Sequence, residues 1–128
     1  MKREMLLTAR TPEDVHHCFE QALAANDIEA LVAIYEPGAV MVPEAGEVVE
    51  GIDAIRIHLE EMMAIKPRLH SETTVTVRSG DVAMLRARWT MSIPSPDGDA
   101  ELSGESTEVV RLQADGTWKC IIDNPYST

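Results

Sequence analysis

The chain has 128 residues, of which 45% are hydrophobic, so it is long enough for one domain with a buried core. Its net charge of −11 argues against nucleic acids and anionic membrane surfaces as partners, because both attract clustered Lys and Arg side chains. Aromatic residues make up only 4% of the chain, so aliphatic and Met side chains must fill much of the core.

The first residues of the chain show no strong structural pattern. We expect residues 1–10 to form a loosely ordered leader before a single domain at residues 11–128. The apolar run Met5–Leu7 is too short for a secretory signal, and no stretch approaches a membrane span. Cys18 and Cys120 lack metal-binding spacing and are expected to be reduced core residues. These features predict a cytoplasmic protein.

Two helices are predicted in the first third of the chain. The first begins at Thr11-Pro12, with Thr11 as the expected capping residue and apolar side chains at helical spacing as far as Leu23. Asp27 then breaks this helix and caps a second one. The apolar face of the second helix is expected to extend to Tyr35.

A short strand and a third helix follow. The apolar segment Ala39–Val42 predicts a strand that stops at Pro43, and residues 44–50 predict a loop or short hairpin. The third helix is expected to begin at Gly51 and to end before Pro67, because proline disfavours helical backbone in the residue that precedes it.

From Leu69 onward the hydrophobic period changes to two, which is typical of strands. Four strands are predicted, separated by turns that contain glycine: Leu69–Arg78, Val82–Ile93, Glu101–Leu112 and Thr117–Asp123. Helices followed by consecutive strands indicate an α+β fold. We expect three N-terminal helices to close a cone-shaped, curved antiparallel sheet, with a ligand site at the mouth of the cone.

Glu108 is the strongest candidate for a functional residue. Strand alternation places it on the same face as Val110 and Leu112. A carboxylate on an apolar face is costly unless it is paired, hydrogen-bonded or protonated. Glu108 therefore either lies in a pocket or pairs across the hairpin with Arg86 or Arg88.

Two further positions leave alternatives open. Asp123 ends the last strand, where it is either solvated or at the rim of the pocket. Trp89 lines either the cavity wall or a subunit interface. The four histidines show no metal-binding spacing, and the chain has no phosphate-binding or cofactor motif, so neither a metal nor a cofactor is expected.

Four segments in a fixed order carry a resemblance to a known superfamily: Phe19–Asp27, Leu31–Tyr35, Val49–Ile55 and Asp115–Lys119. Together they span nearly the whole domain, and the chain resembles the NTF2-like superfamily, which includes SnoaL-like polyketide cyclases and ketosteroid isomerases. The resemblance implies a homodimer formed through the outer face of the sheet. It says little about chemistry, because this fold hosts many functions.

Ketosteroid isomerases use a base Asp together with a Tyr and a protonated Asp that bind the oxyanion. In this sequence Phe19 stands at the position of the Tyr, Val42 at that of the base, and Glu108 at that of the oxyanion-binding Asp. Because Val42 cannot accept a proton, steroid isomerase activity is rejected.

The favoured hypothesis is a small-molecule-binding protein whose apolar pocket contains one buried carboxylate, Glu108. The expected wall residues are Phe19, Tyr35, Met41, Val42, Met62, Trp89 and Val110. The alternative is an isomerase, cyclase or hydrolyase that acts on a hydrophobic carbonyl compound, with Glu108 as general acid and Asp123 as its partner. Binding is favoured because the sequence supplies only one convincing polar group, and catalysis needs two.

Overall fold

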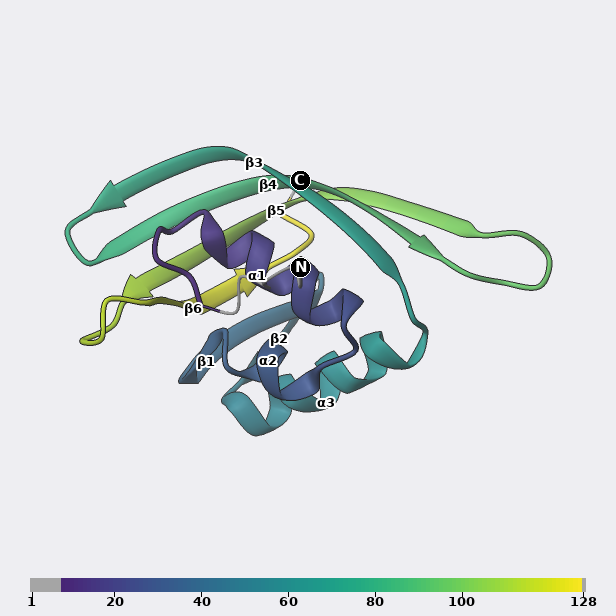
Figure 1. Cartoon of the computed structure of the whole chain (residues 1–128), viewed down its shortest axis with the longest axis horizontal. Coiled ribbons are helices and arrows are strands. Elements are labelled where there is room, and N and C mark those ends of the chain that lie inside the picture. Colours follow the sequence, from purple (N-terminus) through teal and green to yellow (C-terminus); the bar gives the residue numbers. More distant parts are fainter. Residues whose placement is uncertain (1–7, 128) are drawn as a thin grey trace, which may run out of the picture.

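The computed structural model describes residues 8–127, which form three helices and a six-stranded sheet (Figure 1). The helices are α1 (Asp14–Ala24), α2 (Ile28–Val32) and α3 (Ile52–Ala64). The strands are β1 (Tyr35–Glu44), β2 (Glu47–Glu50), β3 (Arg68–Ser79), β4 (Val82–Ile93), β5 (Ala100–Leu112) and β6 (Trp118–Asn124). The α+β class is therefore confirmed.

The sheet has the strand order β2-β1-β6-β5-β4-β3, is open at both edges, and curves over the helices (Figure 1). The four long strands and their turns lie within a few residues of the predicted positions. The expectation of a purely antiparallel sheet is wrong, because β1 runs parallel to β6, with Val40 opposite Ile122. Hydrophobic alternation indicates which face of a strand is buried but not the direction of its neighbour.

The second helix is shorter than predicted. It ends at Val32, and Tyr35 begins β1, opposite Cys120 of β6. The register of β1 against β6 is irregular between Tyr35 and Val40, a segment that contains Pro37. Pairing with β6 overrides the helical spacing that Tyr35 shows in the sequence.

Of the two predicted helix caps, one is confirmed and the other is wrong. Asp27 caps α2 as predicted, since its Oδ1 accepts a hydrogen bond from the Ala30 amide at 3.1 Å. Thr11 does not cap α1, which begins at Asp14. Instead, Oδ2 of Asp14 accepts hydrogen bonds from the amides of Arg10 and Thr11 at 3.0 and 3.1 Å. The carboxylate thus orders the approach to the helix.

The hydrophobic core lies between the sheet and the helices. Ala9 is already part of it, and its carbonyl accepts a hydrogen bond from the Trp118 amide at 2.9 Å. The packed domain therefore begins before residue 11, and residues 1–7 of the expected leader lie outside the described residues. Cys18 and Cys120 are free and buried, as predicted. No helix within residues 8–127 is long and apolar enough to cross a membrane.

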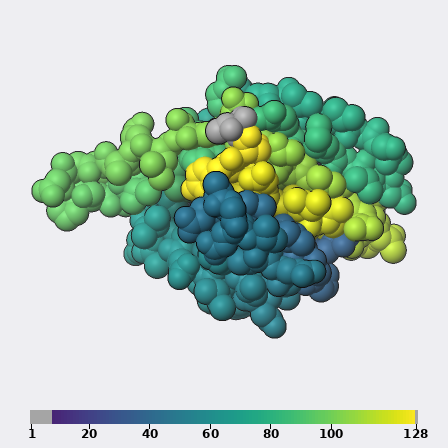
Figure 2. All heavy atoms as spheres, turned by 180° about the vertical axis from the view of Figure 1, so that it is seen from behind, coloured from purple at the N-terminus to yellow at the C-terminus, as the bar shows by residue number. Residues whose placement is uncertain are grey.

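Strands β4 and β5 continue beyond β6 as a hairpin arm, whose tip spans residues 94–99 (Figure 2). Near the base of this arm the indole of Trp89 lies against Gly104, its partner in β5. Trp89 is anchored because its Nε1 donates to the carbonyl of Pro125 at 2.7 Å and its ring meets Tyr126 edge-on. A Cβ atom at Gly104 would lie 2.8 Å from the indole, which is too close.

Replacement of Gly104 by Ala is therefore expected to destabilise the fold by about 1–3 kcal/mol, because the anchored indole cannot move aside. Urea unfolding measures the change. Gly38→Ala is the matched control, since a Cβ atom at Gly38 in β1 meets nothing within 4 Å. Equal unfolding free energies for the two variants would contradict the close packing at Gly104.

Candidate functional site

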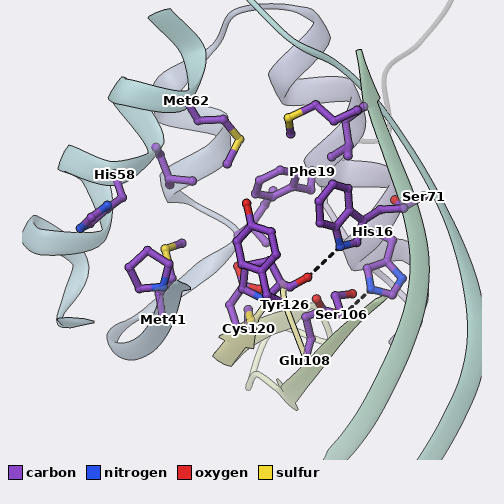
Figure 3. A pocket seen from close by; sticks show the side chains of 18 of the residues that line it. His16, Phe19, Met41, His58, Met62, Ser71, Ser106, Glu108, Cys120 and Tyr126 are labelled. Carbon is purple, nitrogen blue, oxygen red and sulfur yellow. Dashed lines mark hydrogen bonds and ion pairs between the residues drawn. The ribbon is translucent and has the colours of Figure 1, made fainter. Parts of the chain in front are cut away.

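A cavity of about 370 Å³ opens between the sheet, α1, α3 and the segment after β6 (Figure 3). Most of its lining is apolar or aromatic, with Phe19, Met62 and Trp89 among the wall residues. The volume falls at the small end of the range for cavities that hold small organic molecules. A few polar side chains break the apolar lining at one end, and they form two hydrogen-bonded pairs.

The first polar pair joins α1 to β5. The ring of His16 binds Glu108 through Nε2 and Oε1 at 2.6 Å (Figure 3), and the two residues are 8% and 7% exposed. The second ring nitrogen, Nδ1, lies 2.6 Å from Oγ1 of Thr73 in β3. Since both nitrogens are engaged, the ring is held in one orientation, and the Glu108 side chain also hydrogen-bonds the carboxyl group of Asp123.

The second polar pair joins β1 to β6. The hydroxyl of Tyr35 donates a hydrogen bond to Oδ2 of Asp123 at 2.6 Å. Burial, and then the negative charge of Asp123, raise the pKa of Tyr35 well above its usual value, so this phenol stays protonated. Tyr35 reaches the site because it starts β1, next to the strand that carries Asp123.

The two pairs meet where β5 and β6 run side by side. Glu108 and Asp123 are direct partners in the antiparallel register of these strands, and both line the cavity. Burial first, and then the charge of Glu108, raise the pKa of Asp123 from 3.8 to about 7. Near neutral pH the carboxyl group of Asp123 therefore keeps its proton in a large fraction of molecules.

The structure brings together most of the residues singled out in the sequence. Seven of them line the cavity: Phe19, Tyr35, Met41, Met62, Trp89, Glu108 and Asp123. Val42 and Val110 are not part of its lining. Val42 is the strand neighbour of Met41, so its side chain points to the opposite face of β1. Val110 is fully buried where β5 packs solidly into the core.

The alternative pairing of Glu108 with an arginine is wrong. Glu108 lies opposite Leu85 in the β4–β5 register, one residue away from Arg86. Arg86 instead contacts Glu105, at 3.3 Å between Nη2 and Oε1. Because successive strand residues alternate between faces, the one-residue offset places the side chains of Glu108 and Arg86 on opposite faces of the sheet.

Sequence reasoning missed His16 and Thr73. His16 stands one turn before Phe19 on the first helix, which places it at the edge of the apolar face. That spacing, together with the carboxylate of Glu108 on a later strand, was the signal in the sequence that could have indicated His16. The contact spans 92 positions in the sequence, so no local pattern could select His16 over His17, which is exposed.

No group of three or more His, Cys, Asp or Glu side chains within residues 8–127 is arranged to hold a metal ion. The polar end of the cavity holds the His16–Glu108 and Tyr35–Asp123 pairs, with apolar walls around them.

Comparison with known proteins places the chain in a family. Residues 15–121 match the sequence profile of the SnoaL-like domain. The chain belongs to the SnoaL-like family, within the NTF2-like superfamily. No curated protein matches this SnoaL-like chain in sequence.

Solved structures share the SnoaL-like fold at low sequence identity. A protein of unknown function from Mycobacterium tuberculosis is 21% identical with a TM-score of 0.75, over 88% of this chain and 66% of that one. A candidate dehydratase of the NTF2-like family from Streptomyces avermitilis is 19% identical with a TM-score of 0.73, over 89% and 93%. An NTF2-like protein with a cystatin-like fold from Novosphingobium aromaticivorans is 13% identical with a TM-score of 0.73, over 88% and 78%.

The raised pKa of Asp123 gives the protein a predicted pH dependence. Between about pH 4 and about pH 7 the folded chain keeps a proton on Asp123 that the unfolded chain releases, so this residue lowers the free energy of unfolding as pH rises. The loss amounts to at most about 4 kcal/mol. Asp123→Asn should remove that part of the slope, as measured by urea unfolding across this range.

Asp97→Asn, at the exposed tip of the hairpin arm, is the control and should keep the wild-type slope. Parallel pH profiles for the wild type and Asp123→Asn would show that Asp123 titrates normally in the folded protein.

Proposed function

We propose that this SnoaL-like protein is an enzyme that moves a proton at the carbon next to the carbonyl group of a small hydrophobic compound, as in dehydration or isomerisation. The observation that supports this most is the convergence of two carboxyl groups, Glu108 and Asp123, on one apolar cavity. Each has its own fixed partner, His16 or Tyr35. An acid and a base in one site are the minimum for this class of reaction.

Glu108 is the proposed general base. His16 holds its Oε1, and the same side chain hydrogen-bonds the Asp123 carboxyl group, so the substrate proton is proposed to enter this carboxyl pair at Glu108. The imidazole ring of His16 stabilises the Glu108 carboxylate before the reaction. It adjusts to the loss of that negative charge when the substrate proton reaches Glu108. Because Thr73 holds the other ring nitrogen, His16 acts as a positioning residue and not as the base itself.

Asp123 is the proposed general acid. With a pKa of about 7 it carries a proton in a large fraction of molecules at neutral pH, and it can release that proton within the same pH range. Tyr35 donates to Oδ2, so the acidic proton belongs on Oδ1. From there it can pass to a carbonyl oxygen or to a departing hydroxyl group.

This proposal replaces simple ligand binding as the favoured hypothesis, because binding requires one polar group and the cavity holds two complete pairs. The proposed pocket is the cavity under the curved sheet. The sequence predicted a ligand site there, at the mouth of a cone-shaped sheet. The fold shared with the candidate dehydratase from Streptomyces avermitilis is consistent with dehydration, although at 19% identity it supports the fold alone.

A half-reaction tests the proposal without knowledge of the natural substrate. Proton removal next to a carbonyl exchanges hydrogen for deuterium in heavy water, which NMR detects with β-tetralone as the probe. The wild-type protein should accelerate this exchange, and Glu108→Gln should slow it by about 100-fold or more, because the amide cannot accept the proton.

Glu105→Gln is the matched control, since Glu105 lies on the same strand but is exposed and contacts Arg86. It should exchange the probe at the wild-type rate. If wild type and Glu108→Gln behave alike while the probe binds, the cavity is a binding site and Glu108 is not its base.

The same proposal includes a homodimer formed through the outer face of the sheet. A row of apolar side chains crosses five strands on the face away from the helices: Val77, Met84, Val109, Ile122 and Val40, each the register partner of the next. Val77 is 54% exposed and Ile122 is 43% exposed. Such a continuous apolar row on a folded chain favours contact with a second copy.

A cytoplasmic location also remains part of the proposal. Cys18 and Cys120 are free and buried, which is usual where thiols are kept reduced. Burial raises the pKa of the Cys18 thiol to about 11, so little reactive thiolate is present at neutral pH.

A further inference from the structure

We infer that the cavity selects its ligand by charge: it binds uncharged hydrophobic compounds and excludes anionic ones. A substrate that carries a free carboxylate, phosphate or sulfate group is therefore ruled out. The inference rests on the proposed function only in calling the ligand a substrate. The selectivity itself follows from the charged and polar side chains that line the cavity.

No Lys or Arg side chain lines the cavity among the described residues. His16 is the only basic side chain at its polar end, and both of its ring nitrogens are already bound, to Glu108 and to Thr73. The remaining ionisable groups there are acidic or neutral, because the pKa values of Tyr35 and Cys120 are raised by burial. An anion in the cavity would find no free positive partner.

The part of the cavity wall formed by α3 shows the same pattern, in which the basic side chain already has other partners. His58 on α3 lines the cavity at some distance from His16 (Figure 3), and it lies between two acids. Its Nε2 is 3.7 Å from Glu47, and its Nδ1 is 3.7 Å from Glu61, which also lines the cavity. This histidine therefore already has a carboxylate near each of its ring nitrogens. Together with the net charge of −11, this disfavours the approach of an anion.

The apolar walls make the exclusion strong. An ionised carboxylate that leaves water for an apolar cavity without a counter-ion loses several kcal/mol of solvation, which is more than apolar contacts of a small ligand recover.

A cationic ligand is disfavoured for a different reason. Oε1 of Glu108 is already engaged by the ring of His16 at 2.6 Å, and Asp123 holds a proton in a large fraction of molecules at neutral pH. No unpaired negative charge remains at the floor of the cavity to compensate for the desolvation of an ammonium group. Hydrogen-bond donors and acceptors on a neutral carbonyl compound match the site best.

Calorimetric titration of three bicyclic probes of one shape tests the inference. Methyl naphthyl ketone is neutral, naphthoate is anionic and naphthylethylamine is cationic. The wild-type protein should bind the ketone at least about 100-fold more tightly than naphthoate at neutral pH, because the cost of an unpaired buried charge exceeds 2 log units of affinity. The amine should bind no more tightly than the ketone.

One substitution should weaken the preference against anions. Met62 on α3 points into the cavity, so Met62→Arg places a permanent positive charge there (Figure 3). This variant should bind naphthoate at least about 10-fold more tightly than the wild type does, as a paired charge avoids much of the desolvation cost. Ile57→Arg is the control, because Ile57 lies on the same helix, is 58% exposed and does not line the cavity.

Three results would overturn the inference: naphthoate bound within about 10-fold of the ketone, the amine bound at least about 10-fold more tightly than the ketone, or no binding of any probe. A different result would contradict the proposed reaction without affecting the charge selectivity. If the ketone binds selectively but its hydrogens do not exchange with deuterium, the charge selectivity stands and only the catalytic role is lost.

Discussion

Two acidic side chains on neighbouring strands, Glu108 and Asp123, are the constraint around which this end of the molecule is organised. Like charges that face each other beneath an apolar cavity are unfavourable unless each is compensated. His16 compensates one and Tyr35 binds the other, and these partners come from elements that the sheet brings together from distant parts of the sequence. Burial, and then the charge of Glu108, raise the pKa of Asp123, so the cost to stability and the proposed capacity for proton transfer come from the same buried arrangement.

The partners of the two acids also explain why this member of the SnoaL-like family differs from ketosteroid isomerases. Phe19 and Val42 remove two polar groups of that mechanism, and Val42 does not face the cavity. The polar groups that do face it come instead from the start of α1 and the start of β1. A shared fold thus holds a different set of polar side chains, as expected where function depends on the site and not on the scaffold.

The sequence predicted the elements whose signals are local. Period-two alternation located β4 and β5, glycine-containing turns located the hairpins, and Asp27 located the start of α2. Glu108 was predictable because a carboxylate on an apolar strand face needs a special environment. Its partner was not, because His16 is 92 positions away and resembles the exposed His17 in local context. The end of α2 was missed for a similar reason, since only pairing with β6 shows that Tyr35 is extended.

The position of β6 in the sheet has a consequence for how the chain is made. This strand is the last of the described elements to leave the ribosome, yet it lies in the interior of the sheet, with β1 on one side and β5 on the other. Before it emerges, the β1–β2 unit and the β3–β4–β5 meander share no strand pairing. The edges of β1 and β5 that later pair with β6 keep unpaired backbone N–H and C=O groups during synthesis, and chaperones that shield such edges have their longest opportunity here. A single late insertion joins the halves, completes the core and creates the site in one event.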